Sequence, residues 1–250
     1  MSSGLRIDHI DGVRVVRMQF GSANALGETA VEALVEALRA EAAPTVLTGE
    51  GKIFSAGLNL TELDPLGRPA MEEFVERFSQ VMLEALAAPF PLVAAVNGHA
   101  VAGGCVLAMA CDRRVGTDGP FKIGMNEMAI GLTLPSVVTE ILRGRLSPEH
   151  AHTVILGGAL YAPTDARQVG LIDEVAADSD QAVARAVELA RQLGRSLPEF
   201  AAMKRNLVAP IVAAYESSRA ELDAAFLDSW FAEPARATRS ETIARLQRRG

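Results

Sequence analysis

The sequence predicts an α/β fold that ends in a helical region. Runs of β-branched and apolar residues typical of strands alternate with amphipathic helical patterns up to residue 175, and every pattern beyond Asp180 is helical. Hydrophobic residues make up 49% of the 250-residue chain, which is enough to build a substantial core. We therefore expect an α/β core at residues 1–191 and a C-terminal helical region at residues 192–250.

The elements of the first half follow from hydrophobic period and turn residues. Alternating or β-branched runs predict strands at 14–20, 45–48 and 93–96, and residues 53–60 are expected to run from a strand into a loop. Apolar residues at helical spacing predict helices at 25–40, 70–87 and 103–109.

The second half contains fewer strands and more helices. Extended segments are expected at 113–116, 121–124 and 171–175. Helices are expected at 136–142, from Ser147-Pro148-Glu149 onward, at 166–169 behind a Thr164-Asp165 cap, and at 181–193, 199–208, 211–231 and 238–248.

Composition excludes several classes of function. The formal net charge of −7 argues against a nucleic-acid surface. No apolar run is long enough for a membrane span, and the polar start of the chain lacks the core of a signal peptide, so we expect a cytoplasmic protein. Cys105 and Cys111 lie in an apolar helical pattern and are expected to be buried free thiols.

The stretch from Val93 to Met109 is the centre of the predicted fold. A buried strand leads through a turn of small residues to Gly103 and Gly104, which open an apolar helix. The start of a helix offers unpaired backbone N–H groups, and glycine leaves them accessible to a developing negative charge. The alternative is that these glycines only allow the helix to pack closely on its strand.

Other candidate groups have simpler explanations. Ser55 lacks the preceding glycine of a nucleophile elbow and is interpreted as structural. His99 is interpreted as a wall or core residue, with proton transfer as the alternative. Cys105 shows no His–acid pairing in the sequence that would make it a nucleophile. His150 and His152 point to different faces of a helix, so they form a poor metal pair.

Three segments together carry a family resemblance. These are Phe54-Ser55-Ala56-Gly57-Leu58-Asn59-Leu60, the glycine-led stretch Asn97 to Asp112, and Ile123-Gly124-Met125-Asn126-Glu127. In order and spacing they resemble the crotonase superfamily of enoyl-CoA hydratases and isomerases, and the resemblance extends over nearly the whole chain. It implies a crotonase-like (ClpP/crotonase) spiral of ββα units with a C-terminal helical trimerisation region.

The resemblance also implies an acyl-CoA site. The backbone N–H groups of Leu58 and Gly103 would form an oxyanion hole for a thioester carbonyl. The stretch that would bind CoA comprises Ala56, Gly57, Leu58, Asn59 and Leu60. Asn126 would contact the substrate.

The acid–base groups distinguish the activities within this family. Hydratases carry two glutamates, and the position of the first is occupied here by Val106, which cannot transfer a proton. The second position is Glu127. Hydration uses two carboxylates, whereas moving a double bond needs one base. The sequence therefore resembles the Δ3,Δ2-enoyl-CoA isomerases most, although from the residues alone Glu127 could be an ordinary surface carboxylate.

The resemblance leads to one main expectation and two alternatives. We expect an enoyl-CoA isomerase of fatty acid metabolism and β-oxidation that uses an acyl-CoA thioester, no metal, and no cofactor beyond the CoA of its substrate. The alternatives are an enoyl-CoA hydratase and an acyl-CoA-binding protein without turnover; other chemistries of the fold also remain open. We also expect residues 64–73 to border the acyl pocket.

A homotrimer or hexamer is implied as well. The apolar residues of 211–231, including Trp230 and Phe231, fit a buried subunit interface or, alternatively, packing on the chain's own core.

Overall fold

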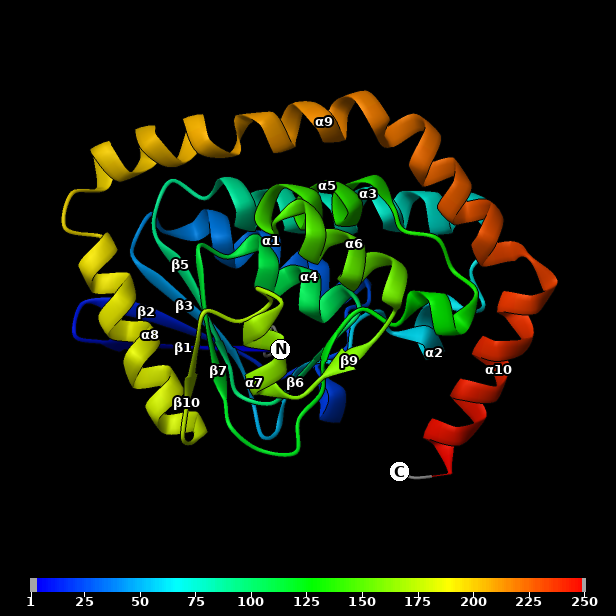
Figure 1. Cartoon of the computed structure of the whole chain (residues 1–250), viewed down its shortest axis with the longest axis horizontal. Coiled ribbons are helices and arrows are strands. Elements are labelled where there is room, and N and C mark those ends of the chain that lie inside the picture. Colours follow the sequence, from blue (N-terminus) through cyan, green and yellow to red (C-terminus); the bar gives the residue numbers. More distant parts are fainter. Residues whose placement is uncertain (1–3, 249–250) are drawn as a thin grey trace.

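The computed structural model describes residues 4–248, and within them the strands form two sheets (Figure 1). The larger, six-stranded sheet contains, in spatial order, β1 (Leu5–Ile10), β2 (Val13–Met18), β3 (Thr45–Gly49), β5 (Leu92–Val96), β7 (Arg113–Thr117) and β10 (Glu174–Ala176). The smaller sheet contains β4 (Ile53–Ser55), β6 (His99–Val101), β8 (Ile123–Gly124) and β9 (Leu160–Tyr161).

The chain alternates between the two sheets. β3, β5 and β7 pair in parallel in the larger sheet, and each is followed by a strand of the smaller sheet, β4, β6 or β8. A helical segment then returns the chain to the next turn. This repetition confirms the predicted spiral of ββα units.

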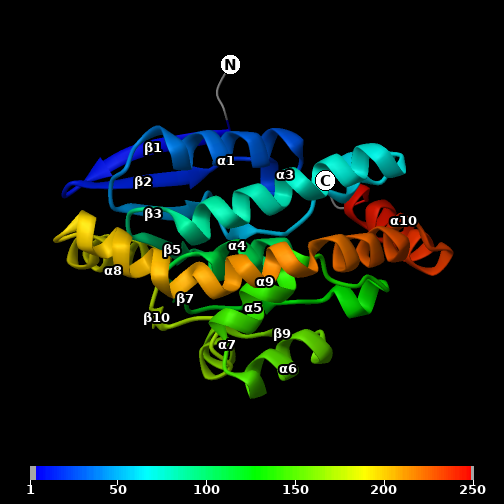
Figure 2. The ribbon, with the colours of Figure 1, turned by 90° about the horizontal axis from the view of Figure 1, so that it is seen from above.

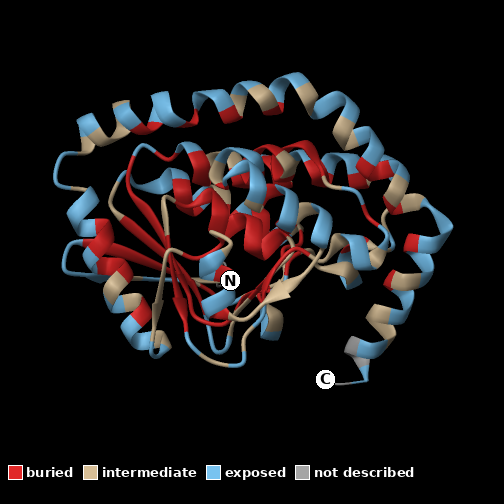
Figure 3. Cartoon of the chain, viewed as in Figure 1, coloured by how far each residue is buried: buried red, intermediate tan, exposed pale blue. Residues whose placement is uncertain are grey.

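Helices surround the sheets. In chain order they are α1 (Glu28–Ala40), α2 (Leu60–Leu63), α3 (Arg68–Ala87), α4 (Gly103–Ala110), α5 (Ser136–Arg145), α6 (Pro148–Gly157), α7 (Pro163–Gln168), α8 (Ser179–Leu193), α9 (Leu197–Phe231) and α10 (Glu233–Gln247). Two short 3-10 helices, η1 (Gly21–Ala23) and η2 (Glu127–Ile130), flank the site described below. Every residue of α4 is buried, so this helix forms the centre of the core (Figure 3).

The C-terminal helices fold back over the rest of the chain. α8 packs on β5 and β7, whereas α9 runs along α5 and α3 (Figure 2). Trp230 is completely buried within the chain, and Phe231 packs at the edge of the same core. Of the two explanations for this apolar face, packing on the chain's own core is therefore the one observed for Trp230.

The division of the C-terminal region into two helices at Pro210 was wrong. α9 is one helix of 35 residues that includes Pro210. Proline removes one intrahelical hydrogen bond, but Pro210 lies on the exposed side, where the freed carbonyl can reach water. The whole helix arches over the molecule (Figure 1).

Three smaller expectations also differ from the structure. β1 has no predicted counterpart, because its exposed face breaks the apolar pattern; it pairs antiparallel with β2 at the sheet edge. The strand expected at 171–175 begins at Glu174. The helix expected behind Thr164-Asp165 begins at Pro163, so these residues lie inside α7 and do not cap it.

A buried ion pair fixes α9 to the core. The Lys204 Nζ donates to Asp112 Oδ2 at 2.8 Å, and the same oxygen accepts the backbone N–H of Leu92 at 2.8 Å. The side chain of Lys204 is only 4% exposed, and burial lowers its pKa. The pair thus joins the long helix to the start of β5.

We expect Lys204→Met to lower the free energy of unfolding by about 3 kcal/mol, because it removes the nearer cation of buried Asp112 and leaves only Arg145, at 3.9 Å. Urea unfolding followed by circular dichroism measures this change. Arg205→Met is the matched control, since Arg205 is the next residue of α9 and is exposed, and it should change stability by about 0.5 kcal/mol or less. Equal effects of the two substitutions would contradict the role of the ion pair.

Candidate active site

A cavity of about 570 Å³ lies between the start of α4, the segment after β4, and the C-terminal helices. We call it the active-site cavity. Its lining comprises Ser22, Ala23, Ala25, Ile53, Ala56, Leu58, Asn59, Leu60, Thr61, Phe78, Val101, Ala102, Gly103, Asn126, Glu127, Ile130, Leu132, Pro135, Val138, Phe226 and Thr242. Most of these side chains are apolar, so a hydrocarbon chain can be accommodated.

The structure brings almost all the sequence-predicted site residues to this cavity. Those that line it are Ala56, Leu58, Asn59, Leu60, Gly103, Asn126 and Glu127. Gly57 lies behind the wall and does not line the cavity. Three segments that are far apart in the sequence thus converge on one space.

The backbone around Leu58 is held by Leu26. The Leu26 N–H donates to the carbonyl of Gly57 at 2.7 Å, and the Asn59 N–H donates to the carbonyl of Leu26 at 3.0 Å. In such a parallel bridge the middle residue, Leu58, directs its own N–H and C=O to the opposite side. The Leu58 N–H therefore does not bond Leu26. Leu58 itself lines the cavity.

The second backbone donor lies at the start of α4. Gly103 is the first residue of this helix, so its N–H has no acceptor within the helix. Ala102 precedes it with φ 52° and ψ −126°, a conformation that is strained for a residue with a side chain. Its own N–H donates to the carbonyl of Gly124 at 2.9 Å. Surrounding contacts such as this hydrogen bond must hold the strained conformation, and they thereby set the peptide plane that carries the Gly103 N–H.

Close backbone approach explains the glycines around these donors. A Cβ on Gly57, which has φ +85°, would lie 2.8 Å from the carbonyl oxygen of Val101 and 3.1 Å from the nitrogen of Gly103. A Cβ on Gly104 would lie 2.3 Å from the carbonyl oxygen of Ser55. The contacts of 2.8 and 2.3 Å with carbonyl oxygens are too short for a side chain, so glycine is needed to bring the two donor segments together.

The carboxyl group of Glu127 is enclosed at the start of η2. Its Oε2 is buried and has no hydrogen-bond partner among the described residues. Burial raises the pKa of Glu127 to about 7, although nearby backbone N–H groups act in the opposite direction. A carboxyl group with such a pKa can both accept and release a proton near neutral pH.

A second acid is not found in the active-site cavity. Within the part of the chain that the structure describes, Glu127 is the one acidic residue that lines it. Val106 is completely buried and does not reach the cavity surface. An aliphatic core residue therefore occupies the position where the two-glutamate pattern would require an acid.

The remaining candidate groups have structural roles. The Ser55 Oγ is buried and accepts the N–H of Gly57 at 3.2 Å. The His99 Nδ1 accepts the N–H of Lys122 at 3.1 Å, and its ring packs edge-on against Phe121. Burial raises the pKa of the Cys105 thiol to about 12, with the charge of Glu127 as the second cause, so the thiol is neutral and unsuited to nucleophilic attack.

The C-terminal helices contribute residues that sequence reasoning missed. Phe226 of α9 and Thr242 of α10 line the active-site cavity. Arg239 holds α10 in place: its Nε donates to Asp64 Oδ1 at 2.9 Å and its Nη1 to the carbonyl of Trp230 at 2.6 Å. No local pattern identifies these residues, because they reach the site only through the fold of the C-terminal region.

Residues 64–73 were expected to border the acyl pocket, but none of them lines the active-site cavity. The wall in this part of the chain is formed by Leu60 and Thr61, whereas Asp64 is turned toward Arg239.

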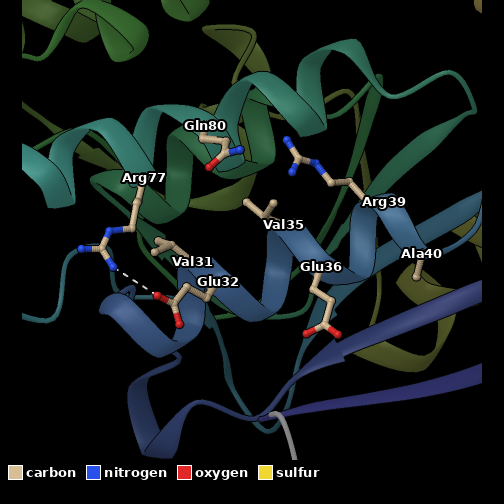
Figure 4. A pocket seen from close by; sticks show the side chains of 8 residues that line it. All are labelled: Val31, Glu32, Val35, Glu36, Arg39, Ala40, Arg77 and Gln80. Carbon is tan, nitrogen blue, oxygen red and sulfur yellow. Dashed lines mark hydrogen bonds and ion pairs between the residues drawn. The ribbon is translucent and has the colours of Figure 1, made fainter.

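A separate cavity of about 560 Å³ lies between α1 and α3 and shares no lining residue with the active-site cavity (Figure 4). Its charged side chains largely pair with each other or with neighbours: Arg77 with Glu32 at 3.1 Å, and Arg39 with Glu84. Charged groups that neutralise each other in this way offer little to a charged ligand.

Neither a cluster of metal ligands nor a membrane-spanning helix is found among the described residues. Among residues 4–248, no group of three or more His, Cys, Asp or Glu side chains converges as metal ligands would. Over the same residues, no helix combines the length and apolar character that crossing a membrane requires.

Sequence relatives agree with the geometry. The family described as Enoyl-CoA hydratase/isomerase matches residues 8–243. Enoyl-CoA delta isomerase 1, mitochondrial, of Mus musculus is 35% identical over 132 residues, which are 52% of this chain and 46% of that protein. A putative enoyl-CoA hydratase of Thermus thermophilus is 34% identical over 166 residues, 65% of this chain and 64% of that protein. The chain spans about half the length of the isomerase relatives it matches.

Solved structures share the fold. The crystal structure of human mitochondrial delta3-delta2-enoyl-CoA isomerase superimposes with a TM-score of 0.90 over 98% of this chain and 99% of that chain, at 23% identity. An enoyl-CoA hydratase/isomerase family protein from Pseudomonas syringae gives a TM-score of 0.80 over 88% and 99% of the two chains, at 28% identity. Because the family match extends over nearly all residues and the spiral fold is shared, this chain belongs to the enoyl-CoA hydratase/isomerase family of the crotonase superfamily.

Proposed function

We propose that the protein is a Δ3,Δ2-enoyl-CoA isomerase, which moves the double bond of a 3-enoyl-CoA thioester to the 2-position. One observation carries the proposal: Glu127 is the one acid among the described lining residues, and it shares the cavity with Leu58 and Gly103. A single base is sufficient for a proton shift, whereas addition of water requires activation of the water and protonation of a carbon.

The proposed reaction has two proton transfers. The Glu127 carboxylate removes a proton from C2, and the electron pair of that bond delocalises into the thioester as a dienolate. The N–H groups of Leu58 and Gly103 stabilise the negative charge on the thioester oxygen. The protonated Glu127 then delivers the proton to C4, which leaves the double bond between C2 and C3 and restores the carboxylate.

Neighbouring groups would position the substrate. The segment from Ala56 to Leu60 would bind the CoA part of the substrate with its backbone, and Asn126 would contact the acyl thioester. The apolar lining would keep water away from the dienolate, which favours return of the proton over hydration. No metal and no cofactor other than the CoA of the substrate takes part in this scheme.

A hydratase is the second candidate, because relatives from Thermus thermophilus and Bacillus subtilis carry hydratase names. It would need a second acid or a differently bound water. Assays of the purified protein with 3-hexenoyl-CoA and with crotonyl-CoA separate the two activities. Isomerisation of the first without hydration of the second supports the proposal, hydration alone rejects it, and binding without turnover indicates an acyl-CoA-binding protein.

The resemblance also leads us to propose a homotrimer or hexamer. Trp230 is packed within its own chain, so other surfaces would have to form the contacts between subunits. Light scattering measures the mass directly, and a monomeric mass at micromolar concentration would reject this proposal.

Glu127→Gln should lower kcat for 3-hexenoyl-CoA by about a thousandfold or more, because the amide cannot take up the C2 proton. Affinity for hexanoyl-CoA, which does not react, should stay within about threefold, since the two side chains have the same shape. Glu72→Gln, on the exposed face of α3, is the control and should retain full activity. If Glu127→Gln keeps more than a tenth of wild-type turnover, Glu127 is not the base.

The activity should depend on pH through Glu127. Its pKa is raised to about 7, and only the ionised carboxylate accepts a proton. Therefore kcat/KM should fall about tenfold for each pH unit well below this pKa and level off above it. A profile measured from pH 5 to pH 9 checks this, and a flat profile through pH 6 would mean that another group governs the reaction.

A further inference from the structure

A second, smaller cavity lies next to Glu127. It has a volume of about 310 Å³, and we call it the rear cavity. Four parts of the chain form its apolar wall: η2, the connection from η2 to α5, α6 and α9. The residues are Met128, Leu134, Ile155, Leu156, Leu222 and Ala225. α6 and the C-terminal half of α9 both contribute residues to this wall.

The rear cavity and the active-site cavity share two lining residues, one of which is the proposed base. Glu127 and Leu132 line both of them. Glu127 therefore borders both cavities, whereas Leu58 and Gly103 line only the active-site cavity.

The chemistry of the rear cavity fits a hydrocarbon. Apart from Glu127, the polar side chains in its wall are those of Thr133 and Thr139. Thr133 already uses its N–H and its hydroxyl group in contacts with Ser229 Oγ at 3.1 and 3.2 Å. A polar ligand would find few free partners here, whereas an alkyl chain needs none.

We propose that the rear cavity binds the distal alkyl segment of the acyl chain and so determines which chain lengths are used. This inference rests on the proposed function, in which C2 to C4 of the acyl group lie at Glu127. The carbons from C5 onward must then leave the carboxyl group, and the cavity that shares Glu127 and Leu132 receives them. Ala225 is the specificity-determining position, because a larger side chain there would fill the space.

Binding of saturated acyl-CoA thioesters tests this without any turnover. Affinity should rise about fourfold for each methylene added from hexanoyl-CoA to dodecanoyl-CoA until the rear cavity is full. In Ala225→Trp this rise should stop at a shorter chain. Dodecanoyl-CoA should then bind the variant at least about tenfold more weakly than the wild type, whereas the affinity for hexanoyl-CoA should change by less than about twofold. Calorimetry measures these affinities.

The neighbouring residue provides the control. Ala224 and Ala225 are both exposed on α9, so neither substitution should disturb folding, but only Ala225 lines the rear cavity. Ala224→Trp should keep the wild-type dependence on chain length. If Ala225→Trp also keeps it, the alkyl chain lies elsewhere, for example against Val138 and Phe226 in the active-site cavity, and the inference is wrong.

Two further outcomes are distinguishable. If Ala225→Trp changes the mass in light scattering and leaves the chain-length series unchanged, the rear cavity is a contact between copies of the chain, and the inference is overturned. If the wild type fails to isomerise 3-hexenoyl-CoA but the series depends on Ala225 as described, the alkyl site is supported and only the isomerase proposal fails.

Discussion

The arrangement of the site depends on keeping one carboxyl group in an apolar cavity without a hydrogen-bond partner for one of its oxygens. Burial alone raises the pKa of Glu127 to about 7, so ionising this group costs folding free energy that the rest of the structure must supply. The same cost makes the group a base near neutral pH. The burial of Glu127 therefore accounts both for the proposed chemistry and for the folding free energy that its ionisation costs.

Backbone geometry brings together the two segments that carry the proposed donors, and both segments line the cavity that Glu127 lines. Gly57 and Gly104 allow β4 and α4 to approach more closely than side chains would permit, and the strained Ala102 sets the orientation of the first amide of α4. These constraints come from well-packed, buried segments. A site built from main-chain groups on such elements keeps its geometry while side chains around it vary, which agrees with the modest identity of the relatives.

Alternation in strands and helical period predicted the α/β core and the helical C-terminal region, whereas the ββα spiral and the lining residues followed from the resemblance of three segments to the crotonase superfamily. Sequence reasoning failed where distant contacts decide. Pro210 does not end α9, because the helix is held by packing on α5 and α3, and the weak pattern of β1 becomes a strand only by pairing with β2. Thr242 reaches the cavity wall through the contact between Arg239 and Asp64, which no local pattern reveals.

The most direct test of the central claim follows the proton itself. The substrate is 3-hexenoyl-CoA carrying deuterium at C2, and the product is analysed by mass spectrometry for label at C4. If Glu127 alone removes and returns the proton inside a cavity that excludes water, part of the deuterium must appear at C4 of the 2-enoyl product. A product whose C4 hydrogen comes entirely from solvent, or a 3-hydroxyacyl-CoA product, would contradict the account.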